Sequence, residues 1–257
     1  MAVTLLKQRS LQDKVSVEEW QTRIELAAAY RLAAHYGWTM MIYNHISARI
    51  PGHDDQFLLN PFGLHYSEVT ASNLVKIDIN GKVIDGSPYK VNEAGFTIHS
   101  AVHAARHDVA AVMHTHTEAG TALSCLDVGL LPLNQDAMVF YNRVAYHDFE
   151  GIALDLDERG RIVKDLGSHY SMILKNHGLL TCGRTVGEAF TFMYQLEHVC
   201  RVQLKAMATG QKLPQPAPEV CEKTAMQFGC NKGTPAGTDE WPHWLRMMDR
   251  LDPSYRD

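Results

Sequence analysis

The stretch Ala-Ala-Val-Met-His-Thr-His-Thr, residues 110–117, holds two histidines that are separated by a single residue. Successive side chains of a β-strand point to opposite faces, so His114 and His116 would share one face of a strand with Val112. Neutral imidazole nitrogens are good ligands for Zn, Co, Ni, Fe and Mn, and two of them a few ångströms apart can hold one ion. The pair alone does not establish a metal site, because two histidines packed in a core or lying on the surface would give the same pattern.

The residues around this pair predict the carboxyl end of a strand. Residues 109–113 are apolar and indicate a buried strand, whereas Thr117, Glu118 and Gly120 are typical of a helix start. The carboxyl end of a strand is the usual place for a functional site in an α/β protein.

Composition narrows the class of protein. The 257 residues allow one large domain or two small ones, and 46% hydrophobic and 21% charged residues are ordinary for a globular chain. A net charge of -5 gives no basic footprint for nucleic acid, and no apolar run is long enough to span a bilayer. The N-terminus lacks a signal-peptide core, and the five scattered cysteines form no Cys-x-x-Cys motif, so we expect a cytoplasmic protein with reduced thiols.

The first half of the chain mixes one helix with several strands. The capping box Ser-Val-Glu-Glu at residues 16–19 opens a predicted helix that ends at Gly37. We then expect strands over 39–44, 46–50 and 57–60 and a short helix over 70–74. The strong turn signal Asn80-Gly81 predicts a hairpin between 75–79 and 82–85.

The second half is predicted to contain helices over 95–106, 117–125 and 164–170, and strands over 137–141, 144–147, 171–176 and 179–182. A long helix starts at Thr185 and runs to about residue 208, and the proline-rich stretch 210–218 indicates a linker. We therefore expect a domain over 1–210, followed by a linker and tail over 211–257. The tail's Trp241 and Trp244 would cover that domain or a neighbouring subunit. The mixture predicts an α/β fold with a largely antiparallel sheet and helices on both sides.

His177 is a candidate third ligand for the metal. Catalytic zinc sites usually have three protein ligands and an open position. His177 follows an apolar strand, and Gly178 permits a close backbone approach. A histidine in an ordinary turn is the alternative, but together with His114 and His116 it completes a ligand set.

The chain contains five motifs that belong together: His114-Thr115-His116, Asn176-His177-Gly178, Asn44-His45-Ile46-Ser47, Asn92-Glu93-Ala94-Gly95-Phe96 and Val186-Gly187-Glu188-Ala189-Phe190. With these motifs, roughly residues 20–210 resemble the class II aldolase/adducin family. The resemblance implies that His114, His116 and His177 bind one divalent metal, zinc first, with Mn or Co as alternatives. It also implies a single three-layer α/β/α domain around a mostly antiparallel central sheet, and a homotetramer with sites at subunit interfaces.

The chain departs from the sugar-phosphate aldolases of that family at the acid/base position. Those enzymes have a glutamate four residues before the histidine that matches His99, whereas here that place is Gly95 and the nearest carboxylate is Glu93. Glu93 is therefore the candidate catalytic residue, and the alternative is a solvated residue favoured at a helix N-terminus. Asn44 and Gly63 are the candidate substrate-binding residues.

The predicted function is that of a metal-dependent carbon–carbon lyase, of aldolase or decarboxylase type, acting on a small oxo or hydroxy acid or a sugar-derived substrate. A metal with three neutral ligands keeps its charge and can stabilise an enolate. The alternatives are a non-catalytic adducin-like binding or scaffold protein and a purely structural metal site. Tyr141, Tyr146 and His147 could face the site, and His99 is expected to be a packed histidine.

Overall fold

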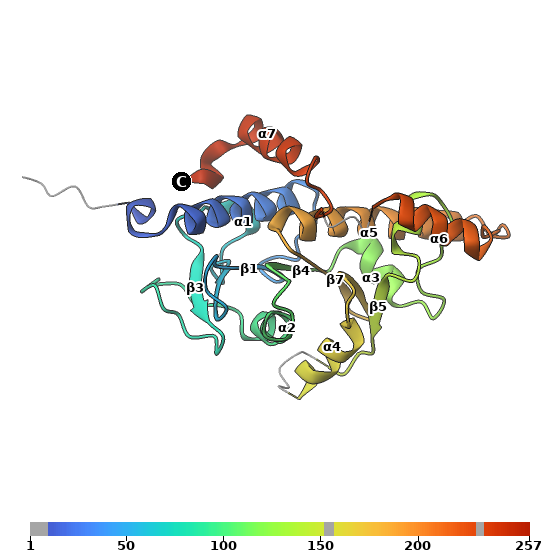
Figure 1. The fold of residues 1–257 in the computed structure, drawn as a ribbon, viewed down its shortest axis with the longest axis horizontal. Helices are drawn as coiled ribbons and strands as arrows, with labels where there is room; N and C mark the ends of the chain where they lie inside the picture. The colour runs from blue at the N-terminus through green and yellow to red at the C-terminus, as the bar shows by residue number, and fades with distance from the viewer. Residues whose placement is uncertain (1–9, 152–156, 230–233) are drawn as a thin grey trace, which may run out of the picture.

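A seven-stranded sheet forms the middle layer of the protein (Figure 1), whose computed structural model describes residues 10–151, 157–229 and 234–257. The strand order is β3-β2-β1-β4-β7-β6-β5. Only β5 and β6 pair in parallel, and all other neighbours are antiparallel, which confirms the mostly antiparallel sheet. The strands are β1 (His45–Arg49), β2 (Gln56–Leu59), β3 (Val75–Asp78), β4 (Ala111–Thr115), β5 (Val144–His147), β6 (Ser171–Leu174) and β7 (Gly178–Gly183).

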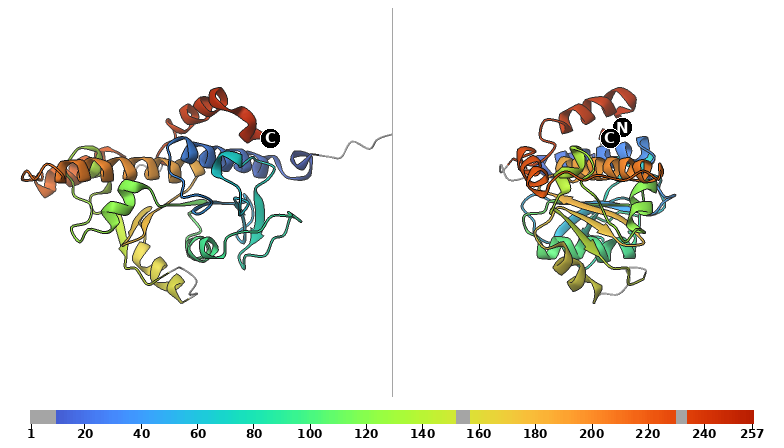
Figure 2. Two further views of the ribbon diagram at one scale, coloured as in Figure 1. Left: turned by 180° about the vertical axis from the view of Figure 1, so that it is seen from behind. Right: turned by 90° about the vertical axis from the view of Figure 1, so that its right-hand side faces the viewer.

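Helices cover both faces of this sheet, so the predicted three-layer α/β/α arrangement is confirmed. The helices α1 (Val17–His35) and α5 (Val186–Met207) lie on one face, and α2 (Glu93–Ala105) and α4 (Glu158–Leu166) lie on the other (Figures 1 and 2). All five residues of β4 are buried, as expected for a central strand covered on both faces. Side chains alternate along it, because Met113 packs into the core beneath α1 and α5 while Val112 packs with α2 and α4.

The remaining helices lie at the ends of the sheet and outside it. These are α3 (Glu118–Ser124), α6 (Pro218–Gln227) and α7 (Trp241–Leu251), with short 3-10 turns at Leu11–Lys14, Tyr66–Glu68, Asp136–Phe140 and Pro253–Arg256. Helix α7 lies over α1 (Figure 1), and its Trp244 packs edge-on against Phe190 of α5 at 5.0 Å between ring centroids. None of the helices in the described parts of the chain combines the length and apolar character needed to cross a bilayer.

Both predicted helix starts carry a cap, but the capping box predicted at residues 16–19 is only half formed, because the Glu19 carboxylate pairs with Arg23 and Lys76. The Ser16 hydroxyl accepts a hydrogen bond from the Glu19 amide at 3.0 Å, and Thr185 caps α5 in the same way. These caps depend on contacts within four residues, which explains why the sequence located both long helices.

Two predictions in the first half were wrong. Residues 39–44 form no strand, only one isolated bridge between Met40 and Tyr43, because Met41 and Asn44 have positive φ values of 50° and 74° that interrupt an extended backbone. The predicted helix over 70–74 is a turn. The Arg23 guanidinium donates hydrogen bonds to the carbonyl oxygens of residues 71 and 74, which are therefore not available to a helix.

In the second half, the strand predicted over 137–141 is instead a 3-10 helix over Asp136–Phe140, of which residues 137–140 are buried. The short helix predicted over 164–170 is α4, which begins at Glu158 and ends at Leu166. The first segment is short and apolar, so its periodicity does not separate helix from strand, whereas for α4 the helix was correct and only its bounds were shifted. Helix α6 follows directly on the proline-rich linker and was not predicted. The division into domains at residue 210 stays a prediction.

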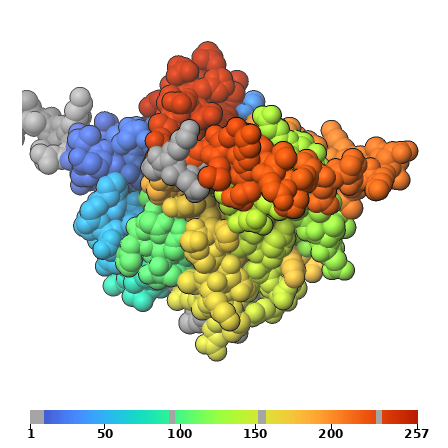
Figure 3. All heavy atoms as spheres, turned by 45° about the vertical axis from the view of Figure 1, so that its right-hand side comes forward, coloured from blue at the N-terminus to red at the C-terminus, as the bar shows by residue number. Residues whose placement is uncertain are grey.

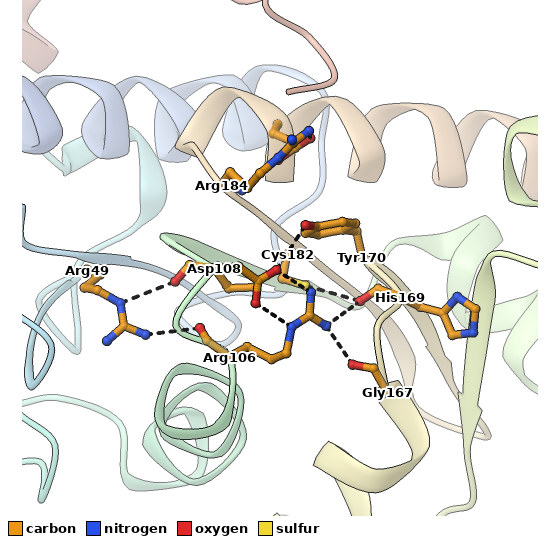
Figure 4. A network of polar contacts seen from close by, with 10 residues as sticks. Arg49, Arg106, Asp108, Gly167, His169, Tyr170, Cys182 and Arg184 are labelled. Atoms are coloured by element: carbon orange, nitrogen blue, oxygen red, sulfur yellow. Dashed lines mark hydrogen bonds and ion pairs between the residues drawn. The ribbon is translucent and has the colours of Figure 1, made fainter. Parts of the chain in front are cut away.

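A polar network around Arg106 holds the segment that leads into β4 (Figure 4). The paired histidines lie at the opposite end of that strand. The Arg106 guanidinium, just beyond α2, donates to both carboxylate oxygens of Asp108 at 2.8 and 2.7 Å. It also donates to the carbonyls of Gly167 and His169 at 2.7 and 3.1 Å. The network therefore joins the end of α2 to the start of β6, and it holds the segment that leads into β4.

Candidate metal centre

Three imidazoles converge at the carboxyl end of β4. The Nε2 atoms of His114 and His116 are 2.9 Å apart. The His177 ring lies with its centroid 4.7 Å from that of His114 and 4.8 Å from that of His116. One nitrogen from each ring lies within 4.8 Å of the others. The structure thus brings together the three residues that the sequence selected as metal ligands, from two segments some sixty positions apart.

Sheet register explains this meeting. Strand β7 runs antiparallel to β4, with Leu179 opposite Thr115, so the turn before β7 lies beside the end of β4. Gly178 is the first residue of β7 after that turn, and a Cβ there would lie 2.5 Å from the Thr115 carbonyl oxygen and 3.2 Å from Cδ2 of His116. Only glycine therefore allows His177 to approach the other two rings this closely.

Left-handed asparagines precede two of the histidines at this end of the sheet. Asn176 has φ 56° before His177, and Asn44 has φ 74° before His45. Asparagine tolerates this conformation better than most residues, and such strain is concentrated at functional sites. The turn at 176–177 is also held by α3, because Ser124 accepts the backbone N–H groups of both residues through its carbonyl and hydroxyl oxygens.

The three rings have the protonation state that a ligand set needs. Burial is the largest cause that lowers the pKa of each ring, to about 4 for His177, so all three are neutral near pH 7. Nδ1 of His114 lies 2.9 Å from the Leu179 carbonyl oxygen, to which it donates, so Nε2 carries the lone pair that faces the other rings.

This donor set fits a divalent cation. Nitrogens bound to one ion at ~2.0–2.1 Å lie roughly 3 Å apart at right-angled or tetrahedral ligand angles. The 2.9 Å between Nε2 of His114 and Nε2 of His116 matches that separation. Neutral imidazole suits Zn, Cu, Fe and Ni, so the geometry by itself does not select zinc.

Sequence reasoning missed a fourth imidazole beside the three. His45 of β1 stands directly opposite His114 in the sheet, with ring centroids 6.2 Å apart and planes 22° from parallel. Burial is the first cause that lowers the pKa of His45, to about 3, and His116 and His177 lower it further by electrostatic repulsion. The alternation of His45 and Ser47 was the available signal, but only register shows which histidine it meets.

A buried polar cluster continues from His45 towards α2. The Ser47 hydroxyl lies 2.7 Å from Nδ1 of His99 and 2.8 Å from Nε2 of His103. The His99 ring lies edge-on to His45 at 5.5 Å between centroids. His99 is thus a packed histidine, as its apolar helix face indicated, and it does not belong to the converging set.

Comparison with known proteins gives the family. The model of the class II aldolase and adducin N-terminal domain matches residues 24–204. The chain belongs to the class II aldolase/adducin family. A putative class 2 aldolase protein of Caulobacter vibrioides is 49% identical over 258 residues, covering 100% of both chains. Alpha-adducin of Rattus norvegicus is 46% identical over 191 residues, which are 73% of this chain and 26% of the adducin.

Solved structures of this family have the same fold. An aldolase II superfamily protein from Pseudomonas syringae is 49% identical, with a TM-score of 0.92 over 96% of this chain and 99% of that one. An L-fuculose 1-phosphate aldolase from Glaciozyma antarctica is 33% identical, with a TM-score of 0.83 over 93% of each chain. The class II aldolase-like architecture predicted from the motifs is therefore confirmed, and membership supports metal-dependent aldolase-type chemistry in general.

The other three predicted site residues, Asn44, Gly63 and Glu93, lie in different surroundings. Asn44 is buried, and neither its amide nitrogen nor its amide oxygen has a hydrogen-bond partner within the described residues. Gly63 is exposed in a turn with φ 104°, a backbone conformation that favours glycine. Glu93 is the first residue of α2, but its side chain lies outside the described residues. The roles of all three stay predictions.

The sequence also indicated His147 and Tyr146 as residues that could face the site. His147 is buried between two carboxylates of α4, with Asp165 2.8 Å from Nδ1 and Glu158 3.4 Å from Nε2. The Tyr146 hydroxyl accepts the Leu130 amide at 3.0 Å. Both side chains therefore hold the end of β5 against its neighbours.

A cavity of about 760 Å³ lies between α5, α6 and residues 234–240, and none of the three converging histidines lines it. Helix α6 runs across the outside of this part of the molecule (Figure 3). The two arginines that line the cavity are each paired with a lining glutamate, Arg143 with Glu222 at 2.6 Å and Arg184 with Glu188 at 2.7 Å. Asp239 and Glu240 also line the cavity, so its carboxylates outnumber its guanidinium groups, and these charges indicate no particular ligand.

Proposed function

We propose that the protein is a divalent-metal-dependent carbon–carbon lyase, of aldolase or decarboxylase type, acting on a small oxo or hydroxy acid or a sugar-derived substrate. The observation that supports this best is the convergence of His114, His116 and His177 as neutral ligands within 4.8 Å of one another. The relative from Glaciozyma antarctica, which is described as an aldolase, adds weight to lyase chemistry.

His114, His116 and His177 would hold the metal, zinc first and Mn or Co as alternatives. A bound divalent cation supplies a sink for the negative charge that develops on a substrate oxygen when a carbon–carbon bond breaks. The chain's own part is to keep the ligands in place without reorganisation. The Leu179 carbonyl fixes the tautomer of His114, and the β6–β7 turn fixes His177.

We assign the remaining roles to residues outside the three-histidine set. Glu93, at the N-terminus of α2, is the candidate that moves a proton to or from the reacting carbon, and Asn44 and Gly63 are candidates for substrate binding. We further propose a cytoplasmic homotetramer, in which a neighbouring subunit completes the site. The free thiols of Cys125, Cys182, Cys200 and Cys221 are compatible with that compartment.

Metal analysis of the purified protein tests this proposal. We expect about one equivalent of a transition metal per chain, and loss of that metal in His116→Ala but not in His198→Ala, an exposed histidine of α5. A panel of oxo and hydroxy acids in D₂O, followed by NMR, should show metal-dependent exchange at the carbon next to the carbonyl. Less than about one-tenth equivalent of metal, with no rescue by added Zn, Co or Mn, would rule the proposal out.

The second candidate is a non-catalytic, adducin-like binding or scaffold protein. The 46% identity with alpha-adducin over 191 residues favours it. A scaffold should keep its partners after His116→Ala, whereas a lyase should lose metal and turnover together. A structural metal site would instead show loss of folding on chelation.

A further inference from the structure

Helix α3 links the two segments that carry the candidate metal ligands. Its N-cap residue Thr117 directly follows His116, and its last residue is Ser124. At that end the helix meets the turn before β7, where the Ser124 hydroxyl accepts the N–H of His177 at 3.2 Å. The Ser124 carbonyl oxygen accepts the N–H of Asn176 at 2.9 Å. One short helix therefore runs from one ligand segment to the other.

The same helix lies against the residue that orients His114. Helix α3 packs on α5 and β7 (Figure 1), and a Cβ at Gly120 would lie 2.5 Å from Cδ1 and Cγ of Leu179. The Leu179 carbonyl oxygen is the acceptor for Nδ1 of His114. Close-packed groups transmit a displacement to their neighbours, so a shift of α3 would move the supports of all three histidines.

The start of α3 is held from α5 rather than by its own N-cap. The Thr117 side chain caps no backbone N–H, and its hydroxyl has no partner within the described residues. Oε2 of Glu197 instead accepts the N–H of Gly120, in the first turn of α3, at 3.0 Å. A carboxylate is favoured at a helix N-terminus, and a helix of seven residues is unstable by itself. The position of α3 therefore depends on Glu197.

Glu197 and Ser124 are both buried, and their hydrogen bonds are directed. Glu197 is 3% exposed, and its other carboxylate oxygen accepts a hydrogen bond from Nη2 of Arg201 at 3.1 Å. A buried carboxylate needs such partners because it has lost its hydration. The Ser124 hydroxyl donates to the Thr121 carbonyl oxygen at 2.7 Å, so its lone pairs are left for the N–H of His177.

We propose that Glu197 and Ser124 are positioning residues, which act through α3 to hold the three histidines of the metal centre in the geometry that binds an ion. The proposal rests on the metal-dependent function above and deepens it, because it assigns what keeps the ligand set in place. Glu197 holds the start of the helix, next to His116, and Ser124 holds His177 from its end.

The test measures the cobalt affinity of the full chain and the visible spectrum of the bound cobalt. Affinity is obtained by competition with a chelator, and circular dichroism verifies that each variant is folded. Hydrogen bonds that orient metal ligands typically contribute about 10–100-fold to metal affinity. We expect Glu197→Met, which removes the acceptor for Gly120, to lower the affinity about tenfold and to change the spectrum. Glu197→Gln keeps an acceptor oxygen and should restore both.

Ser124→Ala tests the other end of the helix. It removes the oxygen to which the His177 N–H donates, and it should also lower the affinity about tenfold. Alanine is the best helix former, so the backbone of α3 is retained in this variant.

Two control variants separate positioning from a general loss of stability. Trp244→Ala loosens α7 at its contact with Phe190. Arg201→Met removes the other partner of Glu197 and leaves the bond to Gly120. Both should keep the wild-type spectrum and bind cobalt within about twofold of wild type, although their melting points fall.

Each outcome decides between the two proposals. If Glu197→Met and Ser124→Ala bind cobalt as wild type does, or lose no more affinity than Trp244→Ala, the positioning role is overturned and the lyase proposal stands. If wild type takes up no cobalt, both are overturned. Should Glu197→Met fail to fold, the comparison of Ser124→Ala with Trp244→Ala decides alone.

Discussion

Gly178→Ala is the substitution that tests the geometry of the histidine site most directly. The added Cβ would lie 2.5 Å from the Thr115 carbonyl oxygen, a backbone atom of the central strand β4. Ordinary contact begins at about 3.4 Å, so the turn and the strand would have to separate by roughly 0.9 Å. The same Cβ would lie 3.2 Å from Cδ2 of His116 and would push that ring as well.

The expected loss has two parts. Forcing one carbon into a packed site costs about 1–3 kcal/mol of unfolding free energy, and here the strand cannot yield easily because all its residues are buried. A shift of this size also exceeds the ~0.5 Å within which a metal constellation must be held. We therefore expect metal affinity to fall at least about tenfold, beyond the loss of stability.

Urea denaturation of the metal-free protein gives the first quantity, and competition with a chelator gives the second. Gly160→Ala is the matched control, because it lies in α4 with no atom within 4 Å of the added Cβ, and it should leave both values unchanged or raise stability slightly. Equal stability and equal metal affinity in Gly178→Ala and wild type would refute the close approach of the two segments.

Two more predictions concern pH and the C-terminal helix. Burial lowers the pKa of five histidines below the unfolded value, to about 3 for His45 and His103, to about 4 for His177, and in the same direction for His99 and His114. The unfolded chain therefore binds more protons, and stability falls as the pH drops below about 6.5. Denaturant titrations of the metal-free protein should show a slope of ~1.4 kcal/mol per pH unit for each group, and a flat profile would contradict the burial of these rings. Trp244→Ala should lower the unfolding free energy by about 3 kcal/mol, because Trp244 docks α7 onto Phe190; an unchanged thermal midpoint would show that α7 contributes nothing to the fold.

Local chemistry explains what could be predicted from the sequence. The helices that begin at residues 17 and 186 have caps made within four residues, and His114 and His116 share a side by simple alternation. Where the prediction was wrong, at residues 39–44 and 137–141, short apolar runs had no local contact that would distinguish a strand from a turn or a 3-10 helix.

The sequence by itself determined the α/β class, the mostly antiparallel sheet and the three histidines that could bind a metal. Periodicity, helix caps and motif spacing depend on residues that are close in sequence, so they can be recognised without the fold. Only the tertiary structure decided that His177 reaches the pair and that His45 stands beside it. Both depend on strand register, which sets residues 45 and 114 opposite each other and brings the β6–β7 turn to the end of β4. Register is a property of paired strands distant in sequence, so no single stretch of the chain contains it.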